Sequence, residues 1–191
     1  MHLIHTQIKG FELVFESSDD QFSPRRIDAG TLALLSVVDF AEGDRVLDLG
    51  CGYGVVGVLA ARVVGPGNVV MVDNDPAAVA LARKNCKRNG VEGVEVILSE
   101  GFSHMDVTGF DLILSNPPYH TDFAVARHFI EKGFNRLVIG GRILMVTKRR
   151  KWYRNKLSTI FGGALVEEID GYQVFQSVKR QSNYAGPRPK R

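Results

Sequence analysis

The sequence has little cysteine and no long apolar run. Only two of its 191 residues are cysteines, Cys51 and Cys86, which excludes a disulfide-stapled fold and favours a reducing, cytoplasmic setting. No stretch approaches the roughly 20 consecutive apolar residues that cross a bilayer. Gln7, Lys9 and Glu12 stand where a signal peptide would need an apolar core. We therefore expect a protein without a membrane partner.

Spaced metal ligands are also missing, and charge is nearly balanced. His120 and His128 have no third ligand at a metal-binding spacing, so no metal is expected. The chain carries 24 Lys and Arg against 21 Asp and Glu, and five of the basic residues fall in residues 179–191, which hold no acid. A second basic run covers residues 148–151. Basic runs attract phosphate backbones, although a solvated helix face and a frayed tail would also carry them.

Hydrophobic periodicity predicts strands that alternate with helices. Residues 3–16 are typical of a hairpin, with Lys9-Gly10 as its turn. The alternation implies an α/β fold with a doubly wound, mostly parallel sheet, closed by an antiparallel pair. We expect a single domain over residues 1–180, with residues 1–27 as an extension and residues 181–191 as a basic, flexible tail. The expected strands are 45–49, 69–72, 94–98, 110–115, 142–147, 165–169 and 172–178, and the expected helices are 28–40, 55–64, 75–89, 123–134 and 152–161.

Three glycines follow the first of these strands. Gly50, Gly52 and Gly54 allow a tight backbone turn that approaches a ligand without a Cβ clash. The amides at the start of the next helix face the same ligand. Asp73 ends the second strand, where a carboxylate can accept both hydroxyls of a ribose. This arrangement predicts a nucleotide-like ligand, with a ligand-free glycine turn as the alternative.

Two cofactors could use this loop. Residues 52–57 formally match the dinucleotide pattern G-x-G-x-x-G, which is a weak signal alone. Asp48, however, stands just before the glycines, where its carboxylate would repel a pyrophosphate. A carboxylate there suits the sulfonium and ammonium groups of S-adenosylmethionine (AdoMet).

The segment Asn116-Pro117-Pro118-Tyr119 follows the apolar strand 110–115. Two consecutive prolines fix the local dihedrals and donate no backbone hydrogen bond. The Asn116 side chain and the neighbouring carbonyls therefore form a rigid, acceptor-rich cradle for a planar NH2 group, and Tyr119 can stack on the ring that carries it. This chemistry indicates methyl transfer to an amide-like or aromatic exocyclic nitrogen.

Residues 48–54, Asp73 and residues 116–119 together resemble the signature set of class I AdoMet-dependent methyltransferases that act on NH2 nitrogens. Phe22-Ser23, residues 28–31 and the closing residues 171–175 resemble the small-domain methyltransferases related to ribosomal RNA guanine-N2 methyltransferases. The resemblance covers about residues 20–178. It implies a seven-stranded Rossmann-like methyltransferase sheet, AdoMet as cofactor, RNA (ribosomal or transfer) as substrate, and a monomer or homodimer.

The resemblance also implies roles for individual residues. The catalytic residues would be Asn116, Pro117, Pro118 and Tyr119. Substrate would be bound by Tyr119, His120, Lys148, Arg149 and Arg150. The cofactor would be bound by Asp28, Thr31, Asp48, Gly50, Cys51, Gly52, Gly54, Asp73, Asn74, Glu100, Gly101, Phe102 and Asn116.

The leading hypothesis is methylation of guanine N2 in ribosomal RNA. Tyr119 is more usual in adenine-N6 and glutamine-N5 methyltransferases, which remain the alternatives within the enzyme class. An RNA-binding module without turnover and a nicotinamide oxidoreductase are the alternatives outside it. Cys51 is interpreted as a small loop side chain rather than a nucleophile.

Overall fold

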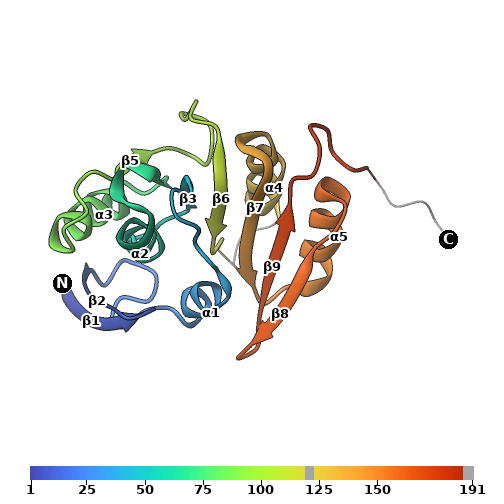
Figure 1. Cartoon of the computed structure of the whole chain (residues 1–191). Coiled ribbons are helices and arrows are strands. Elements are labelled where there is room, and N and C mark those ends of the chain that lie inside the picture. Colours follow the sequence, from blue (N-terminus) through green and yellow to red (C-terminus); the bar gives the residue numbers. More distant parts are fainter. Residues whose placement is uncertain (119–122, 187–191) are drawn as a thin grey trace.

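The computed structural model describes residues 1–118 and 123–186, and the expected alternation of strands and helices is confirmed (Figure 1). The chain begins with the hairpin β1 (His2–Ile8) and β2 (Phe11–Ser17). The remaining elements are α1 (Ala29–Val37), β3 (Val46–Leu49), α2 (Val55–Val64), the 3₁₀ turn η1 (Pro66–Asn68), β4 (Val69–Asp73), α3 (Pro76–Arg88), β5 (Glu95–Leu98), β6 (Phe110–Ser115), α4 (Ala124–Arg136), β7 (Leu137–Thr147), α5 (Arg150–Phe161), β8 (Leu165–Ile169) and β9 (Tyr172–Val178).

Seven strands form one sheet in the order β5-β4-β3-β6-β7-β9-β8. Strands β3 to β7 are parallel to one another, while β9 is antiparallel to both β7 and β8. The chain leaves β3 toward β4 on one side and later returns to β6 on the other. In a doubly wound sheet this reversal opens a crevice beyond the carboxyl ends of the central strands.

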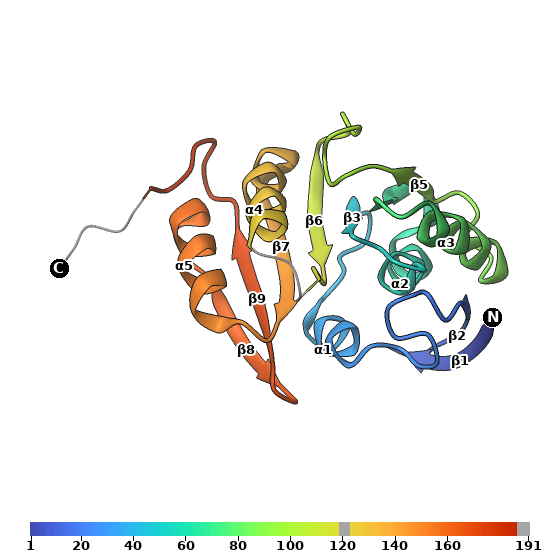
Figure 2. The ribbon, with the colours of Figure 1, turned by 180° about the vertical axis from the view of Figure 1, so that it is seen from behind.

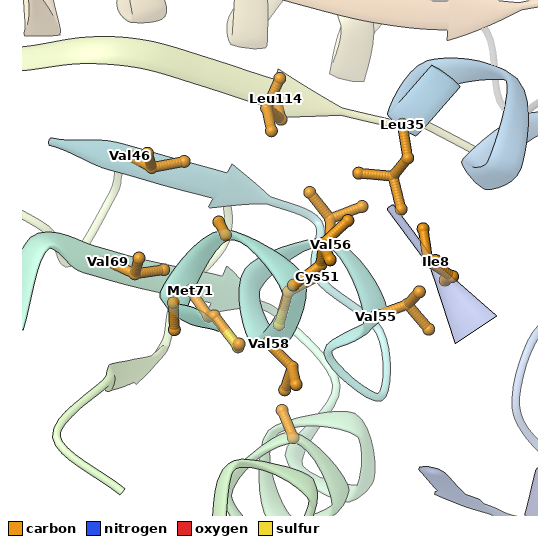
Figure 3. Packing of buried hydrophobic residues seen from close by; sticks show 14 of the residues in the cluster. Ile8, Leu35, Val46, Cys51, Val55, Val56, Val58, Val69, Met71 and Leu114 are labelled. Carbon is orange, nitrogen blue, oxygen red and sulfur yellow. The ribbon is translucent and has the colours of Figure 1, made fainter. Parts of the chain in front are cut away.

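The sheet has a separate apolar core on each face, because alternate strand residues point to opposite sides. One core joins the sheet to α1, α2, α3 and the hairpin, and the other joins it to α4 and α5. Figure 3 shows side chains of α2, including Val56 and Val58, next to Val46, Met71 and Leu114 of the sheet. The close approach of α2 needs Gly57, because a Cβ there would stand 2.3 Å from Met71 Cε.

The expected hairpin is confirmed, with pairing from His2↔Ser17 to Ile8↔Phe11. Its two-residue turn places Lys9 and Gly10 at φ 49° and 83°, the positive values that tight hairpin turns require. The hairpin lies beside α2 and α3, at the end of the molecule away from β8 and β9 (Figures 1 and 2).

Strand β7 begins five residues before the expected Arg142. Leu137 already pairs with Phe110, and the register then shifts before Arg142 pairs with Leu112. Gly140 (φ 89°) and Gly141 lie within this irregularity. The expected strand began only at Arg142, whereas the glycine pair lies at an irregularity inside the observed strand.

The expected tail contacts the body as far as Ala185, whose amide donates to the carbonyl of Ile160 at 3.0 Å. The Tyr184 hydroxyl donates to the carbonyl of Glu131. No helix in residues 1–118 and 123–186 has both the length and the apolarity that crossing a bilayer requires.

Candidate functional site

A cavity of about 420 Å³ opens beyond the carboxyl ends of β3, β4 and β6. It brings together the glycine loop after β3, Asp73 at the end of β4 and residues 116–118 after β6. Its volume falls within the range of roughly 300–1,000 Å³ that is usual for small-molecule sites. The complete described lining is Asp20, Gln21, Phe22, Asp28, Thr31, Asp48, Gly50, Cys51, Gly52, Tyr53, Val55, Val56, Val72, Asp73, Asn74, Asp75, Ala78, Ser99, Glu100, Gly101, Asn116, Pro117, Pro118, Val125 and Phe129.

The charge of this lining is one-sided. Six of its described residues are Asp or Glu, and none is Lys, Arg or His. A cavity walled by carboxylates attracts a cation and repels a pyrophosphate. Its electrostatics therefore favour a positively charged ligand.

The glycine loop turns back against β4. The amides of Gly50 and Cys51 both donate to the carbonyl of Val72, at 2.8 and 2.9 Å. Gly50 and Gly52 take φ values of 76° and 53°, in the left-handed region that favours glycine. Gly54 does not line the cavity, and a Cβ there would stand 3.3 Å from the Cβ of Ala82. Gly54 thus serves the packing of α2 on α3.

Asp73 accepts backbone hydrogen bonds at both of its carboxylate oxygens, one of them from the glycine loop. Oδ2 accepts from the amide of Gly52 at 2.8 Å, and Oδ1 accepts from the amide of Asp75 at 3.0 Å. Asp75 in turn caps α3 through the amide of Ala77. Since an ionised carboxylate offers about four acceptor sites, Asp73 can accept further hydroxyl donors from a ligand.

Asp48 lies on β3 and is only 2% exposed. Its Oδ2 accepts from the amide of Gly57, near the start of α2, at 2.8 Å. Burial raises the pKa of Asp48 to about 7, the Gly57 amide opposes this shift, and the charge of Asp73 adds to it. The carboxylate is thus both part of the cavity wall and an anchor for α2.

Asn116 is held in one orientation by residues from the start of α1. Its Nδ2 donates to Asp28 Oδ2 at 2.8 Å and to Thr31 Oγ1 at 3.0 Å. Asp28 also caps α1 by accepting from the amide of Thr31. An ionised carboxylate can only accept, so the NH2 of Asn116 faces Asp28 and its oxygen points the other way. Asp28 and Thr31 therefore line the cavity and also position Asn116.

The loop after β5 closes another wall of the cavity. Ser99, Glu100 and Gly101 line it, as does Asn74 after β4. Phe102 lies outside the described lining and is 5% exposed, beneath the guanidinium of Arg136. Its ring belongs to the core that faces α4 and α5, and its expected contact with a cofactor stays a prediction.

Sequence reasoning missed the segment between β2 and α1 as a wall of the site. Asp20, Gln21 and Phe22 line the cavity, and Gln21 Nε2 donates to Asp75 Oδ2 at 3.1 Å. Phe22 is 58% exposed. Val125 and Phe129 of α4 were also missed. The segment between β2 and α1 has no hydrophobic periodicity that would mark it as part of a site. Only the resemblance of Phe22-Ser23 to a known family pointed to this segment.

The basic residues after β7 lie near this edge of the sheet but outside the described lining. Because Ser115 pairs with Met145, the turn after Thr147 lies next to residues 116–118. Lys148 Nζ stands 4.8 Å from the ring centre of Tyr172, and the Arg149 guanidinium stands 5.0 Å from that of Phe123. Arg150 is 3.8 Å from Glu168 in an exposed pair. Tyr119 and His120 lie outside the described residues.

Comparison with known proteins finds one family model over most of the chain. The methyltransferase small domain model matches residues 12–176. A ribosomal RNA small subunit methyltransferase C of Pseudomonas putida is 34% identical over 181 residues, covering 88% of this chain and 54% of that protein. The enzyme of the same name from Mannheimia succiniciproducens is 39% identical over 173 residues, covering 87% and 51%.

Solved structures agree with the sequence relatives. The 16S rRNA guanine-N2 methyltransferase of T. thermophilus, in complex with AdoMet and guanosine, superimposes with a TM-score of 0.86 at 28% identity. The match covers 93% of this chain and 50% of that one. The chain thus spans about half the length of the relatives that it matches.

Proposed function

This chain belongs to the methyltransferase small domain family, and we propose that it transfers a methyl group from AdoMet to an exocyclic amino nitrogen of a base in RNA. The proposed target is guanine N2 of ribosomal RNA, since the relatives named above are ribosomal RNA methyltransferases and one was solved with guanosine. We propose residues 1–180 as the catalytic domain and the cytoplasm as its location.

One observation carries this proposal: a single cavity contains both the glycine loop and residues 116–118. A cofactor bound on the loop and Asp73 would share that cavity with an amine bound at Asn116. Transfer of a methyl group needs the two reacting atoms in line at about 3–3.5 Å, and a shared cavity permits this.

The residues present fit AdoMet better than a nicotinamide dinucleotide. The six acidic side chains and the absence of a basic side chain from the described lining suit a cofactor with a sulfonium and an ammonium group. A dinucleotide would bring a pyrophosphate next to Asp48 and Asp73. We assign the ribose hydroxyls to Asp73, the amino-acid end to the region of Asp48 and Gly50, and the adenine to Ser99, Glu100 and Gly101.

AdoMet, when bound, supplies an electrophilic methyl group on a sulfonium. The chain's task is then to present the lone pair of the amine, which is delocalised into the base. We propose that Asn116 Oδ1 and the Pro117 carbonyl accept the two amine hydrogens, so that the nitrogen becomes pyramidal. Fixed dipoles of this kind stabilise the charge that develops on nitrogen. No strong base is needed, because the proton leaves after the nitrogen has become cationic.

The base must leave its stack to reach this cavity, and the chain outside the cavity supplies cations for the surrounding phosphates. We assign this role to Lys148, Arg149 and Arg150, which follow β7 near residues 116–118. Trp152 stacks on Phe123 at 4.3 Å between ring centres and belongs to the same surface.

The test combines a substrate screen with one substitution. Isotope-labelled AdoMet is offered with ribosomal RNA, transfer RNA, ribosomal subunits and protein, and nucleoside mass spectrometry identifies the methylated atom. N2-methylguanosine in ribosomal RNA is expected. Label on adenine N6 would replace the proposed base, and label confined to protein would refute the RNA proposal.

In the same assay, Asn116→Ala should lower kcat by about 10²–10³-fold, the usual effect of losing one transition-state acceptor or donor. AdoMet affinity, measured by calorimetry, should stay within a few-fold. Asn135→Ala is the matched control, because Asn135 is exposed near the end of α4, at the opposite edge of the sheet. Equal loss of affinity and turnover in Asn116→Ala would refute the division of roles.

A further inference from the structure

Two asparagines of α3 hold the free edge of the hairpin. Asn85 Oδ1 accepts from the amide of Glu16 at 2.7 Å, and its Nδ2 donates to the carbonyl of Glu16 at 2.9 Å. Asn89 does the same for Val14, at 3.0 and 2.8 Å. Val14 and Glu16 are alternate residues of β2, so their backbone groups face the same edge. Asn85 and Asn89 are one helical turn apart and thus stand where a neighbouring strand would.

The two asparagines differ in one bond. Asn85 Nδ2 also donates to the carbonyl of Tyr53 at 2.8 Å, whereas the corresponding bond of Asn89 goes to the carbonyl of Asn85 within the same helix. Tyr53 lies between Gly52 and Gly54 and lines the cavity. Asn85 is fully buried. Of the two asparagines, Asn85 is therefore the one that joins the hairpin to the glycine loop.

The ring of Tyr53 is held by the same strand. Phe15 of β2 is fully buried and meets the Tyr53 ring edge-on, at 6.1 Å between ring centres. The loop is thus fixed at its backbone through Asn85 and at its side chain through Phe15. Between them, these contacts tie the wall of the cavity to a hairpin outside the main sheet.

We propose that Asn85 is a positioning residue that couples docking of the hairpin to cofactor binding. Its amide keeps both hydrogens in place only while Glu16 and Tyr53 both accept them. Undocking of β2 would release the amide and, with it, the Tyr53 carbonyl and the turn at Gly52. By linkage, a ligand that favours the ordered loop must also favour the docked hairpin. The inference rests on the proposed function for the identity of that ligand, AdoMet.

The first test compares Asn85→Ala with Asn89→Ala. Both variants lose two hydrogen bonds to β2 and should be destabilised, but only Asn85→Ala loses the bond to the glycine loop. Calorimetry should show AdoMet affinity about three- to tenfold weaker in Asn85→Ala, the usual effect of one lost hydrogen bond. In Asn89→Ala the affinity should stay within about twofold. Equal affinity losses in the two variants would overturn the positioning role.

The second test needs only the unaltered chain. If docking and binding are coupled, saturating AdoMet should slow hydrogen exchange at the Glu16 amide by more than tenfold. Exchange at Glu16 that does not respond to bound AdoMet would overturn the coupling. Failure of the unaltered chain to bind AdoMet at all would instead refute the proposed function, so the two failures are distinguishable.

Discussion

Replacing Asp48 with asparagine should change how stability depends on pH. Asp48 is 2% exposed, and burial raises its pKa from the ordinary 3.8 to about 7. Asp48→Asn keeps the size of the side chain and an oxygen that can accept from the Gly57 amide, but it removes the titration. The comparison of the two proteins therefore isolates this one carboxyl group.

Whether stability rises or falls with pH depends on which state, folded or unfolded, holds the proton on Asp48. Between pH 3.8 and about 7 the folded chain keeps a proton on Asp48 that the unfolded chain has released. The stabilisation is complete below pH 3.8 and is lost as the pH rises to about 7. At about 1.36 kcal/mol for each pH unit of the window, the loss amounts to roughly 4 kcal/mol in all. About 2 kcal/mol of it falls between pH 5 and pH 7, because Asp48 is only half ionised at its folded pKa.

Urea unfolding at pH 5, 6, 7 and 8 measures this loss. The free energy of unfolding of the unaltered chain, minus that of Asp48→Asn, should fall by about 2 kcal/mol from pH 5 to pH 7 and by less than about 0.5 kcal/mol more to pH 8. The m-values of the two proteins should agree, so that the difference reports stability alone. Parallel pH profiles would refute the reasoning, because they would mean that burial does not hold the proton on Asp48.

Two further predictions follow from packing and from surface charge. Gly57→Ala places a Cβ 2.3 to 2.9 Å from three atoms of Met71, so overpacking of about 1–3 kcal/mol should outweigh the helix propensity gain of about 1 kcal/mol. Gly67→Ala, which meets open space, should change the free energy of urea unfolding by less than about 0.5 kcal/mol. Lys148→Ala combined with Arg149→Ala should weaken the proposed RNA binding and lower the slope of log Kd against log salt by about 1 to 2, with an unchanged slope as the contrary result.

Local patterns were enough to predict the order of the elements and the edge of the sheet that carries the site. The glycines at 50 and 52 indicate a tight turn, and the prolines at 117 and 118 indicate a rigid backbone, each within a few residues of sequence. Both conformations can be predicted without a structure, because they arise from steric limits on φ and ψ. The hairpin turn at Lys9 and Gly10 was predicted for the same reason.

Contacts between distant segments could not be predicted in this way. Asn116 and Asp28 are 88 residues apart, and their hydrogen bond depends on how α1 is placed against β6. Phe102 follows three cavity residues directly, yet its ring turns into the other core. Gly140 and Gly141 carry the same local signal as a loop. They lie within β7 because Leu137 before them pairs with Phe110 and because both glycines hydrogen-bond to the backbone of Lys179. Tertiary context decided each of these three cases.

The cap of α1 has a consequence for how the chain responds to heat. One oxygen of Asp28 holds both the Thr31 amide and the Asn116 side chain. Helix ends fray at lower temperature than the sheet beneath them melts, since local opening costs less free energy than global unfolding. Warming should therefore loosen the hold of α1 on the Asn116 amide while the rest of the molecule is still folded, and the proposed methyl transfer should decline before any loss of ellipticity is measurable.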